Sequence, residues 1–312
     1  MRRFLPWLLV VILPGCHEEI SPPSPDLVGR LPIPPNAEHF TLLEIPSDSL
    51  WWRWPCCGSR GGFAVDSAGV PYLIINGARS YHPTYIAQNA LVYEDSWEKS
   101  RTPAYLSGLR TWVTALLQRS DTLEDGAIFP RFDFSYSVHG NPANLLAVGW
   151  HSGYTEGMLL SLLVRSARVT NDAAYADAAD RAFRALTQTA SRRVVHVDSA
   201  NYYWIDEYPL PSPDLTFNGF GYAIRGLYEY WQWKRSVESE QVLLEALTSI
   251  KHYAPQFRVP GKPSLYCLAH RVPEPAYHAQ DVMLLRDFYR MTGDSAFARI
   301  ADDFEADFHP AN

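Results

Sequence analysis

A pattern of thirteen residues occurs twice in this chain and constrains its fold more than any other feature. Residues 168–180 read RVTNDAAYADAAD, and residues 290–302 read RMTGDSAFARIAD, 122 residues further along. Each copy places Thr-x-Asp at a turn and then Ala, an aromatic residue and Ala, as at a joint between two helices. Two hairpin periods of about sixty residues fit between the copies. The spacing therefore predicts an all-α fold in which helical hairpins repeat around a ring.

The apolar positions divide residues 81–312 into four such hairpins. In the first, residues 83–97 place Ile86, Ala90 and Tyr93 on one stripe at helical spacing, and residues 104–119 repeat the pattern. We predict an incomplete (α/α) barrel, or toroid, of about four helical hairpins, whose long inter-hairpin loops line one cavity. The other three hairpins are expected at residues 157–189, 219–253 and 277–308.

The composition argues against some partners and favours others. With 312 residues, 47% of them apolar, the chain is long enough to bury a large core. Its formal charge of −7 and the absence of any block rich in Lys and Arg argue against nucleic acid as a partner. Ten Trp and eighteen Tyr favour stacking on sugar faces, although an aromatic core would give a similar count.

The first residues predict export. Arg2 and Arg3 precede a short apolar run, and residues 13–16 (LPGC) resemble a bacterial lipobox, whose cysteine carries a lipid. We expect residues 1–16 to be a lipoprotein signal peptide with lipidation at Cys16. The protein would then lie in the bacterial cell envelope, facing the periplasm or the surface. Pro14 is unusual in a lipobox, which leaves an uncleaved signal anchor or plain secretion as alternatives.

Two small regions are expected between this segment and the toroid. Residues 17–50 are rich in proline and acidic residues, which is typical of an extended tether. Residues 51–80 combine Gly-rich turns with short apolar runs and predict a small N-terminal β-hairpin appendage.

The cysteines form no evident framework. Cys56 and Cys57 are adjacent and Cys267 stands alone, so a bridge from either of the pair to Cys267 stays open in an oxidising compartment. The chain has neither a CxxC pair nor an HExxH motif, so the sequence predicts no metal site. No cofactor is expected either.

Three inter-hairpin loops concentrate residues that can do chemistry. Residues 202–222 (YYWIDEYPLPSPDLTFNGFGY) place four tyrosines, a tryptophan and an acidic pair beside three prolines. Residues 125–150 and 264–278 likewise set Tyr, His or Arg beside Gly or Pro, whereas the turns at the other ends of the hairpins are short. We interpret the three loops as walls of a carbohydrate site.

Ordered motifs in these loops resemble the C-terminal domain of D-glucuronyl C5-epimerases, enzymes that invert C5 of glucuronic acid in heparan-type polymers. Residues 207–209 (EYP), followed after eight residues by residues 218–220 (NGF), match a family pattern at its spacing. The similarity covers roughly residues 80–308. Further motifs resemble the family's in the same order at residues 85–91 (YIAQNAL), 149–157 (GWHSGYTEG), 265–270 (LYCLAH) and 277–278 (YH).

The chain also departs from the family pattern. Cys267 and Ala269 stand where the family has Asp and Arg, although Arg271 follows two positions later. Ala276 replaces the Asp of a D-Y-H motif, and Asp281 stands where a second His is expected. The resemblance therefore implies the fold, whereas the substrate can differ.

Inversion at C5 of a uronate requires a base on one face of the sugar, an acid on the other, and donors that stabilise the enolate-like intermediate. Tyrosine suits both roles because a phenol with a pKa of about 10 can give a proton and, as phenolate, take one. The family match implies catalytic positions at Glu207, Tyr208, Tyr266 and Tyr277. We expect Glu207 or Tyr208 on one face, Tyr277 on the other, and Tyr266 close to the substrate.

Further residues are candidates for binding the substrate. Arg131 and Arg271 could hold the uronate carboxylate, since a guanidinium pairs both oxygens. His270 and His278 could orient tyrosines or move protons, and Asn218 either caps a helix or touches sugar. The stacking candidates, with core packing as the equal alternative, are Tyr81, Trp150 and Trp204.

These residues predict a uronate C5-epimerase that acts on an acidic polysaccharide outside the cytoplasm. One alternative is a polysaccharide lyase, which begins with the same proton abstraction and then expels the 4-O substituent. Another is a catalytically inactive, lipid-anchored glycan-binding protein, because Ala269 lacks the family's Arg. The expected partners are the polysaccharide and, through the lipid, the membrane; a homodimer is left open.

Overall fold

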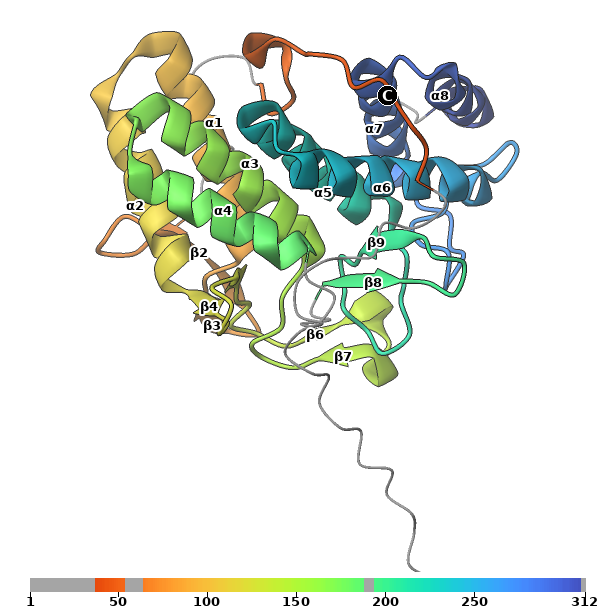
Figure 1. The fold of residues 1–312 in the computed structure, drawn as a ribbon. Coiled ribbons are helices and arrows are strands. Elements are labelled where there is room, and N and C mark those ends of the chain that lie inside the picture. The colour runs from red at the N-terminus through yellow and green to blue at the C-terminus, as the bar shows by residue number, and fades with distance from the viewer. Residues whose placement is uncertain (1–36, 54–63, 188–193, 310–312) are drawn as a thin grey trace, which may run out of the picture.

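Eight α-helices alternate along the parts of the chain that the computed structural model describes, residues 37–53, 64–187 and 194–309. They pair into four antiparallel hairpins, which confirms the predicted number (Figure 1). Three of the hairpins begin a few residues earlier than their apolar periodicity indicated. The bounds are α1 (Pro83–Ser100), α2 (Pro103–Gln118), α3 (Gly153–Thr170), α4 (Ala173–Thr187), α5 (Phe217–Lys234), α6 (Val237–Tyr253), α7 (Pro275–Thr292) and α8 (Ser295–Asp307).

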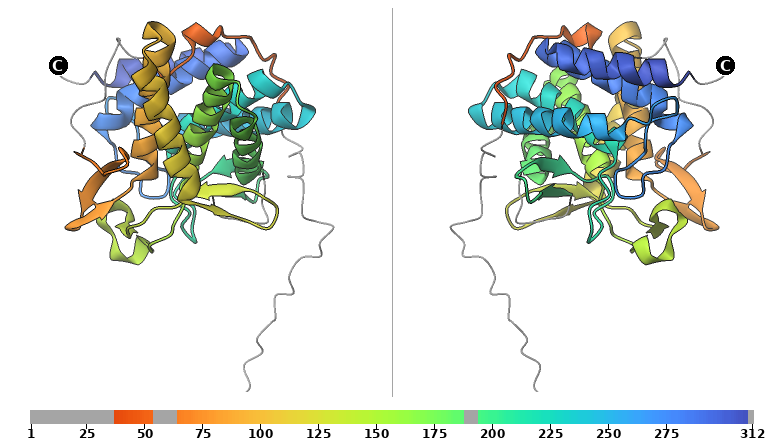
Figure 2. Two further views of the ribbon diagram at one scale, coloured as in Figure 1. Left: turned by 90° about the vertical axis from the view of Figure 1, so that its left-hand side faces the viewer. Right: turned by 90° about the vertical axis from the view of Figure 1, so that its right-hand side faces the viewer.

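The first helices of the hairpins form the inner layer. Helix α3 packs between α1 and α5, and α5 packs in turn against α7. Each second helix, α2, α4, α6 or α8, packs against its own partner. This two-layered arrangement is the predicted incomplete (α/α) toroid, and the two views of Figure 2 show its helices on one side of the molecule and the strand pairs on the other.

The hairpin turns share one geometry, which explains the sequence repeat. In both Thr-x-Asp turns the Asp caps the second helix: Asp172 Oδ1 accepts from the Ala174 N–H at 2.9 Å, and Asp294 Oδ1 accepts from the Ala296 N–H at 2.8 Å. The other two hairpins lack this signature, but in all four hairpins the inner helix ends at a residue in the left-handed conformation. The residues that end the inner helices are Arg101, Asn171, Arg235 and Gly293, with φ between 53° and 68°.

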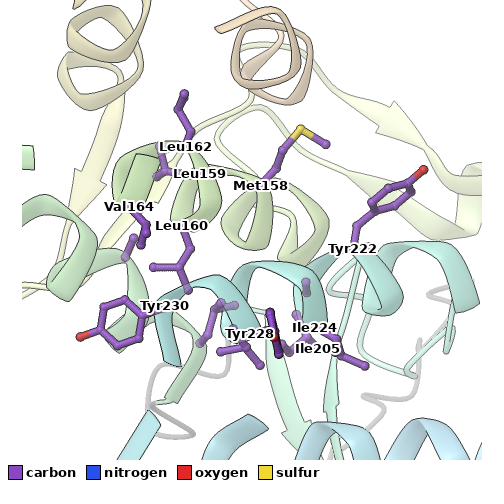
Figure 3. Close-up of a cluster of buried hydrophobic side chains, with 14 of the residues drawn as sticks. Met158, Leu159, Leu160, Leu162, Val164, Ile205, Tyr222, Ile224, Tyr228 and Tyr230 are labelled. Atoms are coloured by element: carbon purple, nitrogen blue, oxygen red, sulfur yellow. The ribbon is translucent and has the colours of Figure 1, made fainter. Parts of the chain in front are cut away.

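The centre of the core is the crossing of α3 and α5 (Figure 3), where Met158, Leu160 and Ile224 are fully buried. The backbones approach closely because glycines face each other. A Cβ on Gly226 would lie 2.8 Å from the carbonyl carbon of Gly157, which is closer than real side chains come. The two inner helices at the centre of the fold are therefore held in one fixed relation.

Short antiparallel strands complete the fold. The predicted β appendage is a three-stranded sheet rather than a hairpin, in the order β1 (Ala64–Val65), β2 (Pro71–Ile75) and β3 (Ala78–Ser80), with Leu73 opposite Ser80. In Figure 1 strands β6 to β9 lie together below the helices. The other pairs are β4 (Ser120–Thr122) with β5 (Ile128–Pro130), β6 (Tyr136–Ser137) with β7 (Leu145–Leu146), and β8 (Val195–Val197) with β9 (Tyr203–Ile205).

Residues 37–53, which we call the N-terminal strap, differ from the expectation of a free tether through residue 50. The strap crosses the inner helices and buries Ile45 and Leu50, each 4% exposed, because these apolar residues interrupt the proline-rich run. Its contacts reach all four inner helices: Leu43 N–H to Met291 O (2.7 Å), Ile45 N–H to Tyr228 Oη (2.9 Å), Arg165 Nη2 to Trp51 O (2.8 Å) and Arg53 Nη1 to Asp95 Oδ1 (2.9 Å).

Some predictions concern residues outside the described ranges. These are the signal peptide at residues 1–16 with Cys16, the tether over residues 17–36, and the cysteine pair Cys56 and Cys57. Cys267 is described and carries a free thiol. Within the ranges that the structure describes, none of the helices combines the length and the apolar character needed to span a membrane.

Candidate active site

The predicted catalytic residues come together at the ends of the inner helices. The Tyr266 hydroxyl donates to Oε2 of Glu207 at 3.1 Å, and the Tyr208 and Tyr266 hydroxyls lie 3.1 Å apart. Because Tyr266 uses its proton on Glu207, the Tyr208 hydroxyl donates to Tyr266. The Tyr277 ring lies 5.1 Å from that of Tyr266. We call these four residues the tyrosine–glutamate cluster.

Two loops are joined to build this cluster. The Phe217 N–H donates to the Tyr266 carbonyl at 3.2 Å, and a β-bridge links Thr216 with Cys267. The stretch that leads into α5 is thus paired with the loop that carries Tyr266. Tyr277 reaches the cluster from the first turn of α7.

A glycine leaves the space that Glu207 occupies. A Cβ on Gly219, in the first turn of α5, would lie 2.7 Å from Glu207 Oε2. Any larger residue would displace the carboxyl group. The backbone beside Glu207 is also fixed, since the Gly153 N–H at the start of α3 donates to the Asp206 carbonyl at 2.8 Å.

Burial separates the acid strengths in the cluster. It raises the pKa of Glu207 to about 7, and the hydrogen bond from Tyr266 only partly opposes this. Burial, followed by the nearby charge of Glu207, raises the pKa of Tyr208, Tyr266 and Tyr277 above the ordinary phenol value. Near neutral pH the three phenols are therefore protonated, whereas the carboxyl group changes its protonation state.

Trp150 continues the aromatic wall. Its ring stacks on Phe132 at 3.7 Å and lies 6.2 Å from the Tyr208 ring. Tyr136 also stacks on Tyr208, with ring centroids 5.6 Å apart. The loop at residues 125–150 thus meets the loop at residues 202–222 at the tyrosine–glutamate cluster.

Three of the other candidates lie near the cluster. Asn218 is buried in the first turn of α5, one residue before Gly219. The His270 Nδ1 lies 2.7 Å from Asp214 and 3.3 Å from the Cys267 sulfur, and Arg271 follows it on the exposed part of the same loop.

The remaining candidates have other surroundings. Exposed Arg131 pairs with Asp121 at 3.2 Å, and the Tyr81 hydroxyl donates to Asp66 at 2.8 Å, away from the cluster. Trp204 is 1% exposed and packs on Phe220, so core packing accounts for it.

His278, which we expected to orient tyrosines or move protons at the site, lies away from the tyrosine–glutamate cluster. It is 2% exposed, its Nδ1 accepts from the Ser264 N–H at 2.9 Å, and its Nε2 donates to the Phe304 carbonyl at 2.9 Å. His278 follows Tyr277 on α7, and its side chain points toward α8, whereas that of Tyr277 points toward the cluster.

The sequence reasoning missed several aromatic residues near the cluster. Tyr136 was hidden in a loop without a clear pattern, although the loop itself was singled out. Tyr154 lies in the first turn of α3 and Tyr222 in the second turn of α5, with rings 4.9 Å apart. Burial, followed by the nearby Tyr222 and Glu207, raises the pKa of Tyr154. Their positions in helix starts that face the same loops are the signal that could have identified them.

The fold defines a class before it defines a family. The chain has the fold of (α/α) toroids such as cellobiose 2-epimerase from Bacillus thermoamylovorans, with a TM-score of 0.59 and 11% identity over 78% of this chain and 65% of that one. The α-1,6-mannanase GH76A from Salegentibacter sp. is similar too, with a TM-score of 0.53 and 13% identity over 80% of this chain and 67% of that one. At these identities the likeness concerns the fold alone.

The sequence comparison is more specific. Residues 125–306, more than half of the chain, match the family described as D-glucuronyl C5-epimerase C-terminus, and the chain belongs to this family. The D-glucuronyl C5-epimerase of Caenorhabditis elegans is 27% identical over 177 residues, which are 51% of this chain. The match spans only 29% of the nematode protein. The resemblance inferred from the loop motifs is thereby confirmed.

Proposed function

We propose that the protein is a carbohydrate epimerase that inverts C5 of a uronate residue in an acidic polysaccharide. The observation that carries the proposal is the hydrogen-bonded arrangement of Tyr208, Tyr266 and Glu207 with Tyr277 beside it. It combines a carboxyl group that titrates near neutral pH with phenols that stay protonated. Family membership supports the same reaction class.

In the proposed mechanism Glu207, as carboxylate, is the final acceptor of the C5 proton on one face of the sugar. Tyr266 relays this proton, because its hydroxyl already donates to Glu207. The electron pair of the C5–H bond moves into the uronate carboxylate and forms an enolate-like intermediate. Tyr277 then gives its proton to C5 from the opposite face, and the pair returns to form the new C–H bond. Glu207 afterwards releases its proton to solvent, and the Tyr277 phenolate takes one back.

The substrate carboxylate gains charge in this intermediate and needs donors. We propose Arg271 for this role, since it lies on the exposed part of the Tyr266 loop. Trp150 and Tyr136 would support the sugar face beside Tyr208. We also propose that the protein acts outside the cytoplasm, held to a bacterial membrane by a lipid on Cys16.

A single experiment tests the proposed reaction. The purified chain is incubated with candidate polyuronates in deuterated water, and exchange at C5 is followed by NMR together with the ultraviolet absorbance of unsaturated uronates. Exchange without new absorbance is the expected result. New absorbance would instead indicate a lyase, which expels the 4-O substituent after the same first step. Binding without exchange or absorbance would indicate an inactive glycan-binding protein.

A further inference from the structure

Four potential metal-binding atoms come together next to Tyr266. They belong to His139, Asp214, Cys267 and His270, and all lie within 4.8 Å of one another. The two imidazoles each approach one oxygen of Asp214, His139 Nε2 at 2.9 Å and His270 Nδ1 at 2.7 Å. The Cys267 sulfur lies 3.6 Å from His139 Nε2 and 3.3 Å from His270 Nδ1.

These residues come from three separate segments. His139 lies in the short 3-10 turn η3 (Val138–Gly140) between β6 and β7, and Asp214 lies in the stretch before α5. Cys267 and His270 lie in the Tyr266 loop, where the Ala269 N–H donates to the Asp214 carbonyl at 3.3 Å. The cluster therefore joins all three loops that surround the tyrosine–glutamate cluster.

The backbone around the four residues is held in a conformation that side chains disfavour. His139 has a φ of 54°, and so do Leu215, next to Asp214, and Arg271, next to His270. Residues other than glycine adopt this left-handed region infrequently. Each of the three loops thus has a left-handed residue at or next to a donor residue.

Asp214 is the hydrogen-bond acceptor that the other three members of the cluster share. If both imidazole nitrogens donate to its oxygens, neither has a lone pair for the Cys267 thiol proton, and the thiol hydrogen-bonds to the Asp214 side chain instead. The thiol is fully buried, so water does not serve it. The thiol is likewise no candidate nucleophile, because the sulfur is inaccessible to a substrate.

We propose that His139, Asp214, Cys267 and His270 form a binding site for one Zn²⁺ ion. Zinc prefers four ligands in a tetrahedron, with bonds of about 2.0–2.1 Å to nitrogen or oxygen and about 2.3 Å to sulfur. Such bonds place nitrogen and sulfur about 3.5 Å apart, close to the observed 3.3 and 3.6 Å. The distance between the Asp214 oxygen and the imidazole nitrogens need increase by only about half an ångström to complete the tetrahedron.

The chemistry of the donor set selects this class of ion. A thiolate and two imidazoles suit zinc and exclude Mg²⁺ and Ca²⁺, which take oxygen ligands. Binding displaces the thiol proton of Cys267 to solvent, so that one thiolate and one carboxylate balance the two charges of the ion. A neutral site suits this partly buried position, where Asp214 and Cys267 are inside and the two imidazoles are about a third exposed or less.

A second residue is placed to orient one ligand. The Asn144 side-chain amide lies 3.3 Å from His270 Nε2, the ring nitrogen that points away from the cluster. With Nδ1 on the metal, Nε2 carries a proton and requires an acceptor, which the amide oxygen of Asn144 supplies once the amide is turned by half a rotation. The site thus contains both the four ligands and a hydrogen-bond partner that orients the His270 ring.

Four protein ligands fill the tetrahedron, so the ion has a structural role rather than an open catalytic position. It would fix the loop of Tyr266 relative to the stretch before α5. His270, expected from the sequence to contact substrate, becomes a positioning residue in this proposal. Zinc binding itself does not depend on the proposed epimerase reaction, and it replaces the sequence-based expectation of no metal site.

The test uses the full chain without a polyhistidine tag, reduced and freed of metal with a chelator. Zinc is titrated against a chromogenic chelator, and cobalt is added to a second sample. We expect one zinc per chain, a higher melting temperature with zinc, and a sulfur-to-cobalt charge-transfer band in the near ultraviolet. Magnesium and calcium should change none of these signals.

Variants locate the site. Cys267→Ala should abolish the cobalt band and weaken zinc binding by at least about 100-fold, and His139→Ala should weaken zinc binding similarly. The matched controls are the Cys56→Ala/Cys57→Ala double variant and His39→Ala at an exposed histidine, which should bind zinc as the parent does. The proposal is overturned if the parent chain gives no cobalt–sulfur band, or if the band survives in Cys267→Ala. The first of these outcomes holds even if a variant fails to fold.

Discussion

The hydroxyl of Tyr266 donates a hydrogen bond of 3.1 Å to the carboxyl group of Glu207, a residue 59 positions earlier in the chain. The contact joins two inter-hairpin loops and couples a phenol to a carboxyl group whose pKa is about 7. A proton that arrives at the phenol oxygen can therefore pass on without a further group. This relation is the basis for the first two predictions.

Tyr266→Phe should abolish the relay while preserving the fold. The ring keeps its packing against Tyr277, but the hydroxyl group that hydrogen-bonds to both Tyr208 and Glu207 is lost. We expect the rate of C5 exchange to fall by about 10²–10⁴-fold, the usual contribution of a general acid or base. Exchange is measured by NMR in deuterated water. Tyr289→Phe, at an exposed tyrosine on α7, is the control and should exchange at the parent rate.

Glu207 should determine the pH dependence of the reaction. The carboxylate is the active form of a base, so the rate should rise as pH increases and level off above about 7. Glu207→Gln should reduce the rate by at least about 100-fold and remove this rise from the residual activity. The rate is measured between pH 5 and pH 9 (about two units either side of the carboxyl pKa). A rise that persisted in the Gln variant would assign the titration to another group.

The same carboxyl group should lower stability at high pH. Its pKa is higher in the folded chain than the ordinary 4.5, so the folded state holds the proton more tightly, and stability is lost as pH rises through about 7. Above that pH the cost is on the order of 3 kcal/mol. Glu207→Gln should therefore melt several degrees higher than the parent at pH about 8 but not at pH about 5.

Glu245→Gln is the matched control for this prediction. Burial raises the pKa of Glu245 to about 8, but the residue lies on α6, outside the tyrosine–glutamate cluster. It should gain stability at high pH in the same way and keep full activity. If both variants lost activity, the loss would reflect a general disturbance of the fold.

The crossing of α3 and α5 should tolerate no side chain at Gly226. A methyl group there meets the backbone of Gly157, whereas a methyl group on Gly221 of the same helix meets the Leu284 side chain, which can move. We expect Gly226→Ala to cost about 3 kcal/mol or more, and Gly221→Ala clearly less. Denaturant unfolding of the two variants compares the costs. Equal costs would mean that the helices separate more readily than the structure indicates.

Arg165 should be far more important for stability than an exposed arginine with as many ion pairs. It lies in the core and donates to Glu229 at 2.7 Å and to Glu94 at 3.3 Å. Arg165→Met would leave buried carboxylates without a partner, at a cost of about 3–5 kcal/mol. Arg286→Met, which breaks pairs with exposed Asp302 and Glu305, should cost less than about 1 kcal/mol. Thermal unfolding of the two variants at neutral pH compares these costs, and equal costs would contradict the prediction.

The repeat and the apolar periodicity were sufficient to predict the helical hairpins, because helix length and turn chemistry are local properties. The turn at Asn171-Asp172 shows this: the left-handed residue and the cap that follows it lie within three positions. The three loops could also be identified from the sequence, because each lies between two predicted hairpins and has an unusual composition.

Other features depend on contacts between distant segments. His278 and Tyr277 are adjacent, yet one packs on Phe304 and the other on Tyr266, and periodicity alone could not say which face meets the site. The cluster of His139 and Cys267 draws on residues 128 positions apart, so no spacing motif reveals it. The strap was misjudged because prolines suggested an extended chain, while its few apolar residues find partners only in the assembled helices.

The contacts of the N-terminal strap also bear on the order of assembly. Its partners include Tyr228 and Met291, so this early segment must wait for helices that are synthesised much later. Closing so large a loop is slow compared with forming a hairpin. A chain emerging from the ribosome therefore cannot complete its native structure until most of it has been synthesised.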